Sequence, residues 1–117
     1  MKSIGKIGEE MAVQFLSKNG YNILDKNIKA PFGEIDIIAE KDNCVCFVEV
    51  KSRKTEKYGL PEEAITQVKK NKIIKVAQFY IKKKHIKHKL FRFDVISINF
   101  NKNFGQRIRH IANAFSQ

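Results

Sequence analysis

The chain has 117 residues, of which 43% are hydrophobic, so it is expected to form one domain, residues 1–117, with a core of its own. No apolar run approaches the roughly 20 residues that span a bilayer and the N-terminus lacks the apolar segment of a signal peptide, which argues against a membrane protein and makes the cytoplasm the expected location. The formal net charge of +11 favours a polyanionic partner such as nucleic acid, although a lysine-rich composition with only four arginines also fits an AT-rich genome.

The first predicted element is a helix that begins after Ser3 and ends at about Asn19. Ser3 is a favourable N-cap residue, and Gly20 is a favourable residue for ending a helix. Glu9 lies at the margin of the apolar stripe, so it is either a glutamate that complements the helix dipole or an accessory acid at the rim of a site. The residues of the stripe follow helical spacing: Ile4, Ile7, Met11, Ala12, Phe15 and Leu16.

A short strand is predicted at residues 21–24 and a loop at residues 28–33, because Pro31 cannot pair within a central strand. A β-hairpin is predicted next, from two short runs rich in β-branched and apolar residues at 33–39 and 44–51. The polar residues between these runs provide the turn. Both strands are therefore expected in a sheet that is largely buried.

Three charged residues interrupt the apolar runs of this hairpin: Asp36 in the first strand, and Glu49 and Lys51 in the second. If Asp42 and Asn43 form a two-residue turn, the numbers of paired residues sum to 85, and Asp36 lies opposite Glu49. Glu49 and Lys51 are two residues apart and share a face of their strand. The hairpin therefore predicts that two carboxylates and one ammonium group converge.

Such a convergence suggests a metal site. Two neighbouring buried carboxylates repel each other, so one of them would normally take up a proton. A hard divalent cation such as Mg²⁺ removes this repulsion and prefers oxygen ligands. Lys51 would then position the attacking water or stabilise charge that develops on a phosphate. The alternative is an ordinary edge strand that carries a surface pair of Glu49 and Lys51 and an unrelated Asp36.

The segment after the hairpin is polar and basic. Arg53 and Lys54 lie in it, and it forms either a loop that meets a phosphate backbone or a solvated connection. A long helix is predicted at residues 61–84, with a proline at its first position. Lys69 and Lys70 on this helix are candidate nucleic-acid contacts, with simple solvent exposure as the alternative. Because a helix between two strands forms a crossover, the next strand is expected to run parallel to the hairpin's second strand.

The last predicted strand covers residues 90–100, and its pattern alternates. Asp94 falls on the same side as Arg92, and a salt bridge between them is preferred to a catalytic role. Residues 108–115 close the chain as a short strand or helix. The predicted fold class is therefore α/β, with a mixed sheet of about five strands flanked by helices.

Asp36 followed on the next strand by Glu49-x-Lys51 resembles the core of the PD-(D/E)xK nuclease superfamily. Motifs along nearly the whole chain resemble the uncharacterised YraN-type family, which is thought to share its fold with archaeal Holliday-junction resolvases. The motifs that carry this second resemblance are Gly8-Glu9, Gly20-Tyr21, Gly33-Glu34-Ile35-Asp36, Phe47-Val48-Glu49-Val50-Lys51-Ser52-Arg53, Gly59-x-Pro61-x-x-Ala64, Arg92-Phe93-Asp94-Val95 and His110-Ile111-x-Asn113-Ala114-Phe115.

The resemblance implies a restriction-endonuclease-like fold and a metal-dependent endonuclease that hydrolyses phosphodiester bonds of DNA, including branched DNA of the Holliday-junction type. Cutting a four-way junction with two active sites would need a homodimer, but no heptad or apolar patch in the sequence indicates one. The alternatives are a nucleic-acid-binding module that does not cut, and a basic domain that binds an acidic protein. The implied residues are Asp36, Glu49, Glu9 and the Val50 carbonyl for Mg²⁺ or Mn²⁺, Lys51 for catalysis, and Arg53, Lys54, Lys69 and Lys70 for nucleic acid.

Overall fold

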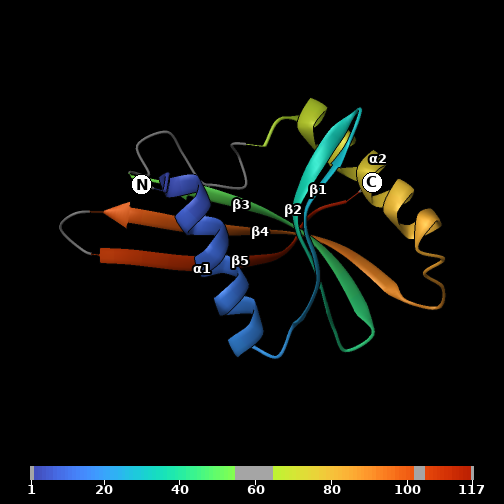
Figure 1. Cartoon of the computed structure of the whole chain (residues 1–117), viewed down its shortest axis with the longest axis horizontal. Helices are drawn as coiled ribbons and strands as arrows, with labels where there is room; N and C mark the ends of the chain where they lie inside the picture. Colours follow the sequence, from blue (N-terminus) through green and yellow to red (C-terminus); the bar gives the residue numbers. More distant parts are fainter. Residues whose placement is uncertain (1, 55–64, 102–104, 117) are drawn as a thin grey trace.

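Five strands form one mixed sheet, with a helix packed on each of its two faces (Figure 1). The computed structural model describes residues 2–54, 65–101 and 105–116. The elements are α1 (Ile4–Lys18), β1 (Asn22–Ala30), β2 (Gly33–Lys41), β3 (Cys44–Arg53), α2 (Gln67–Lys83), β4 (Leu90–Asn101) and β5 (Gly105–Phe115). The strands lie in chain order, and only β3 and β4 pair in parallel. The predicted α/β class and mixed sheet are confirmed, and they are consistent with a restriction-endonuclease-like fold.

The first predicted helix is confirmed as α1. The Ser3 side chain caps it by accepting a hydrogen bond of 3.2 Å from the backbone N–H of Lys6. After the helix, Gly20 has a φ of 86°, in the left-handed region that glycine adopts without strain. The buried residues Ala12 and Leu16 turn the apolar stripe of α1 towards the sheet. The core that they join on this face also contains Ile37, Ala39, Cys46, Val48, Ile96 and Ile98.

Gly8 is the point of closest approach between α1 and the sheet. A Cβ atom added at Gly8 would lie 1.9 Å from Ser52 Oγ and 3.2 Å from Ser52 Cβ, and both distances are too short for van der Waals contact. Gly5 lies one turn earlier, where an added Cβ would meet only Ser3 Oγ, at 3.8 Å. The missing side chain at Gly8 therefore allows the helix to pack close to β3.

We expect Gly8→Val to lower the free energy of unfolding by about 1–3 kcal/mol, because the valine would overpack the contact with Ser52. Gly5→Val is the matched control, since it places the same side chain on the same helix in open space. Urea unfolding followed by circular dichroism measures both variants. Equal stability of the two variants would show that α1 does not depend on close packing at Gly8.

The strand β1 is longer than the sequence predicts, and the predicted loop at residues 28–33 is wrong. Residues 28–30 belong to β1, where Ile28 pairs with Ile35 and packs against the core. Pro31 does not interrupt the strand, because it lies in the turn that follows. β1 is also an outer strand of the sheet, where only one neighbour requires backbone hydrogen bonds.

The predicted hairpin of β2 and β3 is confirmed, with its register. The two turn residues, Asp42 and Asn43, have φ values of 51° and 62°, as the tight type I′ turn requires. The paired residues run from Lys41 and Cys44 to Ile37 and Val48. Each of these pairs sums to 85, so the turn sets the register over this stretch. The predicted pair of Asp36 and Glu49 is not formed, because pairing ends at Ile37 and Val48.

Helix α2 begins at Gln67, later than the predicted start at residue 61, and ends at Lys83, close to the predicted end at residue 84. Thr66 has extended backbone angles, and its hydroxyl accepts a hydrogen bond of 3.1 Å from the N–H of Lys69. This N-cap starts the helix, so a continuous helix from Pro61 is wrong, and Pro61 itself lies outside the described residues. The parallel pairing of β3 with β4 confirms that α2 belongs to a crossover connection.

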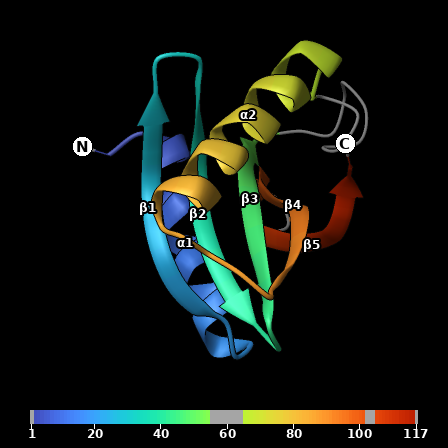
Figure 2. The ribbon, with the colours of Figure 1, turned by 90° about the vertical axis from the view of Figure 1, so that its right-hand side faces the viewer.

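Helix α2 covers the opposite face of the sheet from α1, mainly over β2 and β1 (Figure 2). Residues 108–115, for which the sequence predicts either a strand or a helix, belong to the outer strand β5, which pairs with β4. Within the described ranges, neither helix combines the length and the apolar character needed to cross a membrane. The core on the α2 face contains Ile35, Ile38, Val45, Phe47, Ile73, Val76, Ala77 and Tyr80.

Candidate functional site

Asp36 lies where β2 stops pairing with β3. The last paired residues of the two strands are Ile37 and Val48. The next contact is made by a side chain, because Asp36 Oδ2 accepts a hydrogen bond of 2.8 Å from the backbone N–H of Val50. Figure 2 shows the β1–β2 hairpin separating from β3 towards its turn. The Asp36 carboxylate is therefore fixed at the point where the sheet opens.

The alternation of side chains in β2 changes at the same point. Ile35 and Ile37 are two residues apart and would share a face in a regular strand, but Ile35 packs in the α2-side core and Ile37 in the α1-side core. In β1, Asn27 lies between the partners of these two residues and has a left-handed φ of 51°. Both strands thus turn here, and Asp36 lies at the boundary between the two faces.

On the α1 face, Glu9 approaches Asp36. Glu9, Asp36 and Lys6 line one cleft between α1 and the sheet. The pKa of Glu9 is raised above its usual value, first because the side chain is partly buried, and then by the negative charge of Asp36 and a hydrogen bond with it. Glu9 thus lies beside Asp36 at the rim of the site, while its role as a metal ligand stays a prediction.

On the α2 face, Glu49 is a buried carboxylate with a lysine partner. Only 7% of Glu49 is exposed, and its Oε1 lies 3.0 Å from Nζ of Lys69 on α2. Burial and the nearby charge of Asp36 raise the pKa of Glu49 to about 7, although Lys69 and Lys51 oppose this shift. The carboxylate is therefore poised between its protonated and ionised forms near neutral pH.

Lys51 extends from the same face of β3 as Glu49. Partial burial and the positive charge of Lys69 lower the pKa of Lys51, and the charges of Glu49 and Asp36 only partly compensate. For Lys69, burial acts in the same downward direction, but the charge of Glu49 outweighs it and raises the pKa. Asp36 thus links two sets of groups: Glu9 approaches it on the α1 face, and Glu49, with Lys51 and Lys69, lies near it on the α2 face.

Lys69 is one of the residues predicted to contact nucleic acid, but in the structure it pairs with Glu49. It lies one turn before Ile73 and two turns before Val76 on the buried stripe of α2, which points it at Glu49. The helical spacing of Lys69 relative to Ile73 and Val76 can be read from the sequence, and it predicts that Lys69 faces the sheet. Lys70 instead lies 5.8 Å from the centre of the Phe115 ring.

The other predicted residues lie around the cluster. Val50 contributes its N–H to Asp36, whereas the predicted role of its carbonyl as a ligand stays a prediction. Arg53 follows two residues after Lys51 on the same strand, and Lys54 is exposed immediately after β3. Arg53 and Lys54 are therefore close in sequence to Lys51.

The chemistry of the cluster suits a hard cation. Glu9, Asp36 and Glu49 offer only carboxylate oxygens, the ligands that Mg²⁺ and Mn²⁺ prefer. Across residues 2–54, 65–101 and 105–116, no three or more His, Cys, Asp and Glu side chains are arranged as a metal-binding group. In the structure the ammonium group of Lys69 neutralises Glu49. The carboxylate oxygens are thus of the chemical type that such a cation binds, while in the structure Lys69 supplies the positive charge at Glu49.

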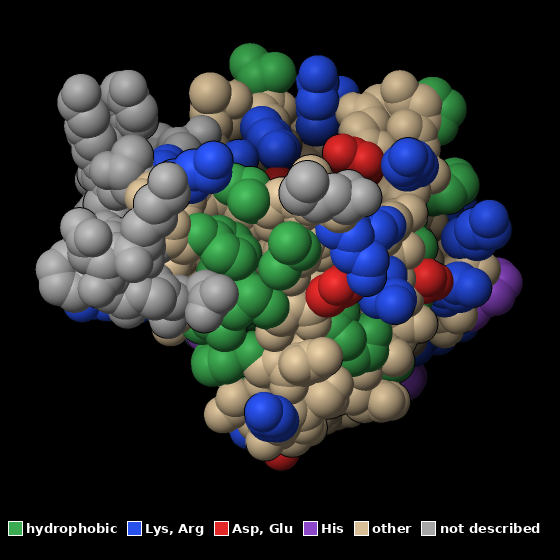
Figure 3. Space-filling view, turned by 60° about the vertical axis from the view of Figure 1, so that its left-hand side comes forward, with side chains coloured by type: hydrophobic (Ala, Val, Ile, Leu, Met, Phe, Trp, Pro, Cys, Tyr) green, Lys and Arg blue, Asp and Glu red, His purple; other side chains and the backbone are tan. Residues whose placement is uncertain are grey.

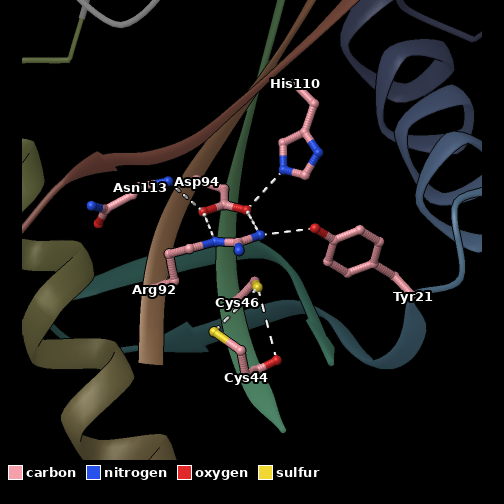
Figure 4. Close-up of polar contacts among 7 residues, drawn as sticks. All are labelled: Tyr21, Cys44, Cys46, Arg92, Asp94, His110 and Asn113. Carbon is pink, nitrogen blue, oxygen red and sulfur yellow. Dashed lines mark hydrogen bonds and ion pairs between the residues drawn. The ribbon is translucent and has the colours of Figure 1, made fainter. Parts of the chain in front are cut away.

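A second polar cluster, on the α1 face of β4, is centred on Asp94 (Figure 4). Asp94 is fully buried and accepts hydrogen bonds from Arg92 Nε at 2.8 Å, Arg92 Nη2 at 2.9 Å, His110 Nε2 at 2.8 Å and the Asn113 N–H at 2.9 Å. Arg92 Nη2 also donates to Tyr21 Oη at 2.8 Å. The predicted salt bridge is confirmed, and the cluster ties β4 and β5 to the chain after α1.

Comparison with known proteins gives one consistent result. A family model described as "Uncharacterised protein family UPF0102" matches residues 8–98. A UPF0102 protein of Caldanaerobacter subterraneus subsp. tengcongensis is 47% identical over 97% of this chain and 95% of its own length. UPF0102 proteins of Persephonella marina and Clostridium botulinum are 51% and 50% identical, over 95% and 97% of this chain and 91% and 94% of their own lengths.

Proposed function

The chain belongs to the uncharacterised protein family UPF0102, and from this premise we propose that it is a metal-dependent endonuclease that hydrolyses phosphodiester bonds of DNA. The observation that carries the proposal is the group of three carboxylates and two lysines where β2 leaves β3. A purely structural role would favour complete pairing of these charges. Instead, burial and the charge of Asp36 raise the pKa of Glu49, although Lys69 and Lys51 lie beside it.

In this proposal Asp36 and Glu49 hold Mg²⁺ or Mn²⁺, with Glu9 and the Val50 carbonyl as further ligands. The ion would supply positive charge that stabilises the phosphate in the transition state. The N–H of Val50 keeps the Asp36 carboxylate in place. Glu49 accepts a cation most readily in its ionised form, and with a pKa of about 7 roughly half of it is in that form at neutral pH.

Lys51 is proposed to bind the attacking water and to take part in moving its proton. A lysine is a poor proton acceptor at its usual pKa, because it is then almost always charged at neutral pH. Burial and Lys69 lower the pKa of Lys51, which brings it closer to the range useful for proton transfer. Its place beside Glu49 on β3 puts this amine next to the proposed metal ligands.

The proposed substrate is DNA, and branched DNA of the four-way type is the form that the resemblance favours. A homodimer belongs to this proposal, since two sites are needed to cut a junction symmetrically. Figure 3 shows lysine and arginine side chains beside carboxylates on one face of the molecule, around a group of hydrophobic side chains. Together with the net charge of +11, the lysine and arginine side chains on this face support contact with the phosphates of DNA.

Cleavage of a substrate panel tests the proposal directly. The panel contains a linear duplex, a single strand, a flap and a four-way junction, each incubated with Mg²⁺ or Mn²⁺. We expect the parent protein to cut at least one of them and Lys51→Ala to cut it about 100-fold or more slowly, as is typical when an acid–base group is lost. Gel electrophoresis of end-labelled strands measures the rates.

Lys82→Ala is the control, because Lys82 is an exposed lysine in the last turn of α2, far along the helix from Lys69. It should cut at the parent rate. Binding without cleavage by the parent, under every metal condition, would favour the alternative of a non-catalytic nucleic-acid-binding module on the same fold.

A further inference from the structure

Exposed aromatic rings and lysines gather where helix α2 crosses the turn of the β1–β2 hairpin (Figure 2). A Cβ atom added at Gly33 would lie 3.2 Å from Cβ of Lys72 and 3.4 Å from Cγ2 of Val76, so the hairpin packs directly on the helix. Phe32 precedes Gly33 in the turn, and its ring centre lies 6.3 Å from that of Phe79 on α2. The two rings are nearly perpendicular, at 82°. The packing of the hairpin on the helix therefore fixes a pair of rings at the surface.

Both rings remain open to solvent. Phe32 is 38% exposed and Phe79 is 48% exposed, although phenylalanine is among the residues most often fully buried. Nζ of Lys83 lies 5.8 Å from the centre of the Phe79 ring, but such a contact at an exposed site is weaker than the stacking of a nucleotide base on an aromatic ring. The rings are therefore available to a flat ligand.

Two lysines flank the rings on the exposed side of α2. Lys72, Lys75 and Phe79 are three and four residues apart, so their side chains follow one another along the helix surface. Both lysines are exposed, and neither forms an ion pair with any residue that the structure describes. They line one cleft together with Phe32. We call these four residues, Phe32, Lys72, Lys75 and Phe79, the platform.

The platform is continuous with the candidate functional site. A second cleft shares Glu34 and Lys72 with the first one. It is also lined by Lys69, whose Nζ lies 3.0 Å from Oε1 of Glu49. Among the described residues that line the two clefts, three lysines face a single acid, Glu34. From Lys69 to Phe79 the helix rises about 15 Å, which is the length of roughly four stacked nucleotides.

We propose that the platform binds unpaired nucleotides of single-stranded DNA, whose bases stack on the two rings while their phosphates contact Lys72 and Lys75. Rings interleaved with lysines match a ligand that combines flat bases with a negatively charged backbone, and only unpaired bases offer their faces to a protein ring. The proposal rests on the proposed function, because it takes the carboxylates at Glu49 as the point where the strand is cut. The preferred substrate is then a flap or another branched DNA with a single-stranded segment.

Binding of a fluorescent 20-nucleotide single strand tests the platform, with metal omitted so that no cutting occurs. Phe32→Ala and Phe79→Ala should each bind the single strand about fivefold or more weakly, as expected when a stacked base loses its ring. Their binding to a 20-base-pair duplex should change by less than about twofold, since paired bases do not stack on the protein. Phe32→Leu keeps an apolar side chain in the turn but removes the ring, so it should also weaken binding of the single strand. Circular dichroism shows that each variant is folded.

Phe91→Ala is the matched control for the rings. Phe91 is 40% exposed, but it pairs with Val45 near the start of β3 and so lies at the other end of β2 from Gly33. This variant should bind the single strand as the parent protein does. A loss equal to those of Phe32→Ala and Phe79→Ala would overturn the proposal.

The dependence of binding on salt tests the two lysines. The double variant Lys72→Gln, Lys75→Gln should lower the slope of log affinity against log salt by about 1.4, since each lost phosphate contact on a single strand removes about 0.7. Lys18→Gln, Lys87→Gln is the control, because it removes two exposed charges outside the platform. Equal changes of slope in the two double variants would overturn the role of Lys72 and Lys75.

Two further results would overturn the whole proposal: a parent protein that does not bind the single strand, and ring variants that lose single strand and duplex to the same extent. A parent protein that binds the single strand through the platform but cuts nothing would contradict the nuclease and support the platform. Cleavage by a parent protein whose ring variants bind the single strand normally would support the nuclease and contradict the platform.

Discussion

Replacement of Glu49 with glutamine is expected to remove metal binding and to lower cleavage by about 1,000-fold or more. The change keeps the size of a side chain that is only 7% exposed but removes the negative charge that a divalent cation requires. In the parent protein, Mg²⁺ at 100 times its dissociation constant should stabilise the fold by about 2.7 kcal/mol and raise the melting temperature by roughly 10 °C. Thermal unfolding with and without Mg²⁺ or Mn²⁺ measures this shift, which Glu49→Gln should abolish.

The raised pKa of Glu49 predicts how stability and metal affinity depend on pH. Its folded-state pKa of about 7 lies above its ordinary value of 4.5, so the folded protein holds a proton that the unfolded chain releases between these values. Without metal, the stability that this proton provides is present below pH 4.5 and is lost as the pH rises through 7. With metal the order reverses, because ionised Glu49 is needed, and apparent metal affinity should fall about tenfold for each pH unit below 7.

Glu10→Gln is the control for both measurements. Glu10 is an exposed acid on α1 that pairs with Lys2 at 2.7 Å, and it stands next to Glu9 in the sequence. This variant should keep the metal-dependent shift of the melting temperature. If the parent shows no shift with either metal, the metal-binding role of Glu49 is wrong.

The second large effect is expected from Asp94→Asn, which should lower the free energy of unfolding by about 3–5 kcal/mol. Asp94 is fully buried and accepts four hydrogen bonds, two of them from Arg92. An asparagine would leave the Arg92 charge without its counter-ion and would turn a donor towards other donors. Such a loss is a large share of the 5–15 kcal/mol that holds a typical domain together.

Acid unfolding separates this effect from simple loss of packing. Burial alone would raise the pKa of Asp94, but the hydrogen bonds from His110, Arg92 and the Asn113 N–H outweigh burial and hold the pKa below its ordinary value of 3.8. The stability from ionised Asp94 is therefore present above about pH 4 and is lost as the pH falls through the lower, folded-state pKa. Asp94→Asn should show a weaker dependence on pH in that range.

Asp42→Asn serves as the comparison, because Asp42 is exposed in the tight turn, where asparagine is equally suited to a left-handed φ. Its unfolding free energy should stay within about 0.5 kcal/mol of the parent value. A similar small effect in Asp94→Asn would show that the buried cluster contributes little to stability.

Local patterns in the sequence predict most of the sheet. The turn at Asp42 and Asn43 fixes the register of β2 and β3, because a two-residue turn allows few alternatives. Ser3 and Gly20 mark the ends of α1 by their preferences at helix ends. At the turn and at the two ends of α1, the local residues are sufficient to determine the backbone geometry.

The errors arise where distant parts of the chain decide the structure. Pro31 suggests a loop over residues 28–33, but residues 28–30 pair with β2 and Pro31 lies in the turn beyond them, which depends on the partner strand. The contact between Glu49 and Lys69 joins β3 to a helix that begins later than predicted. The change of face at Asp36 depends on two strands turning together, which no periodicity in β2 alone reveals.

The two outer strands of the sheet share a feature that bears on solubility at high concentration. In β1 the pairing shifts between Ile23 and Asp25, and in β5 it shifts opposite Phe93 and Val95. An irregular outer strand is a poor template for the strand of another molecule, and charged side chains along it add repulsion. Both rims of the sheet therefore discourage the edge-to-edge pairing of strands from which fibrils grow.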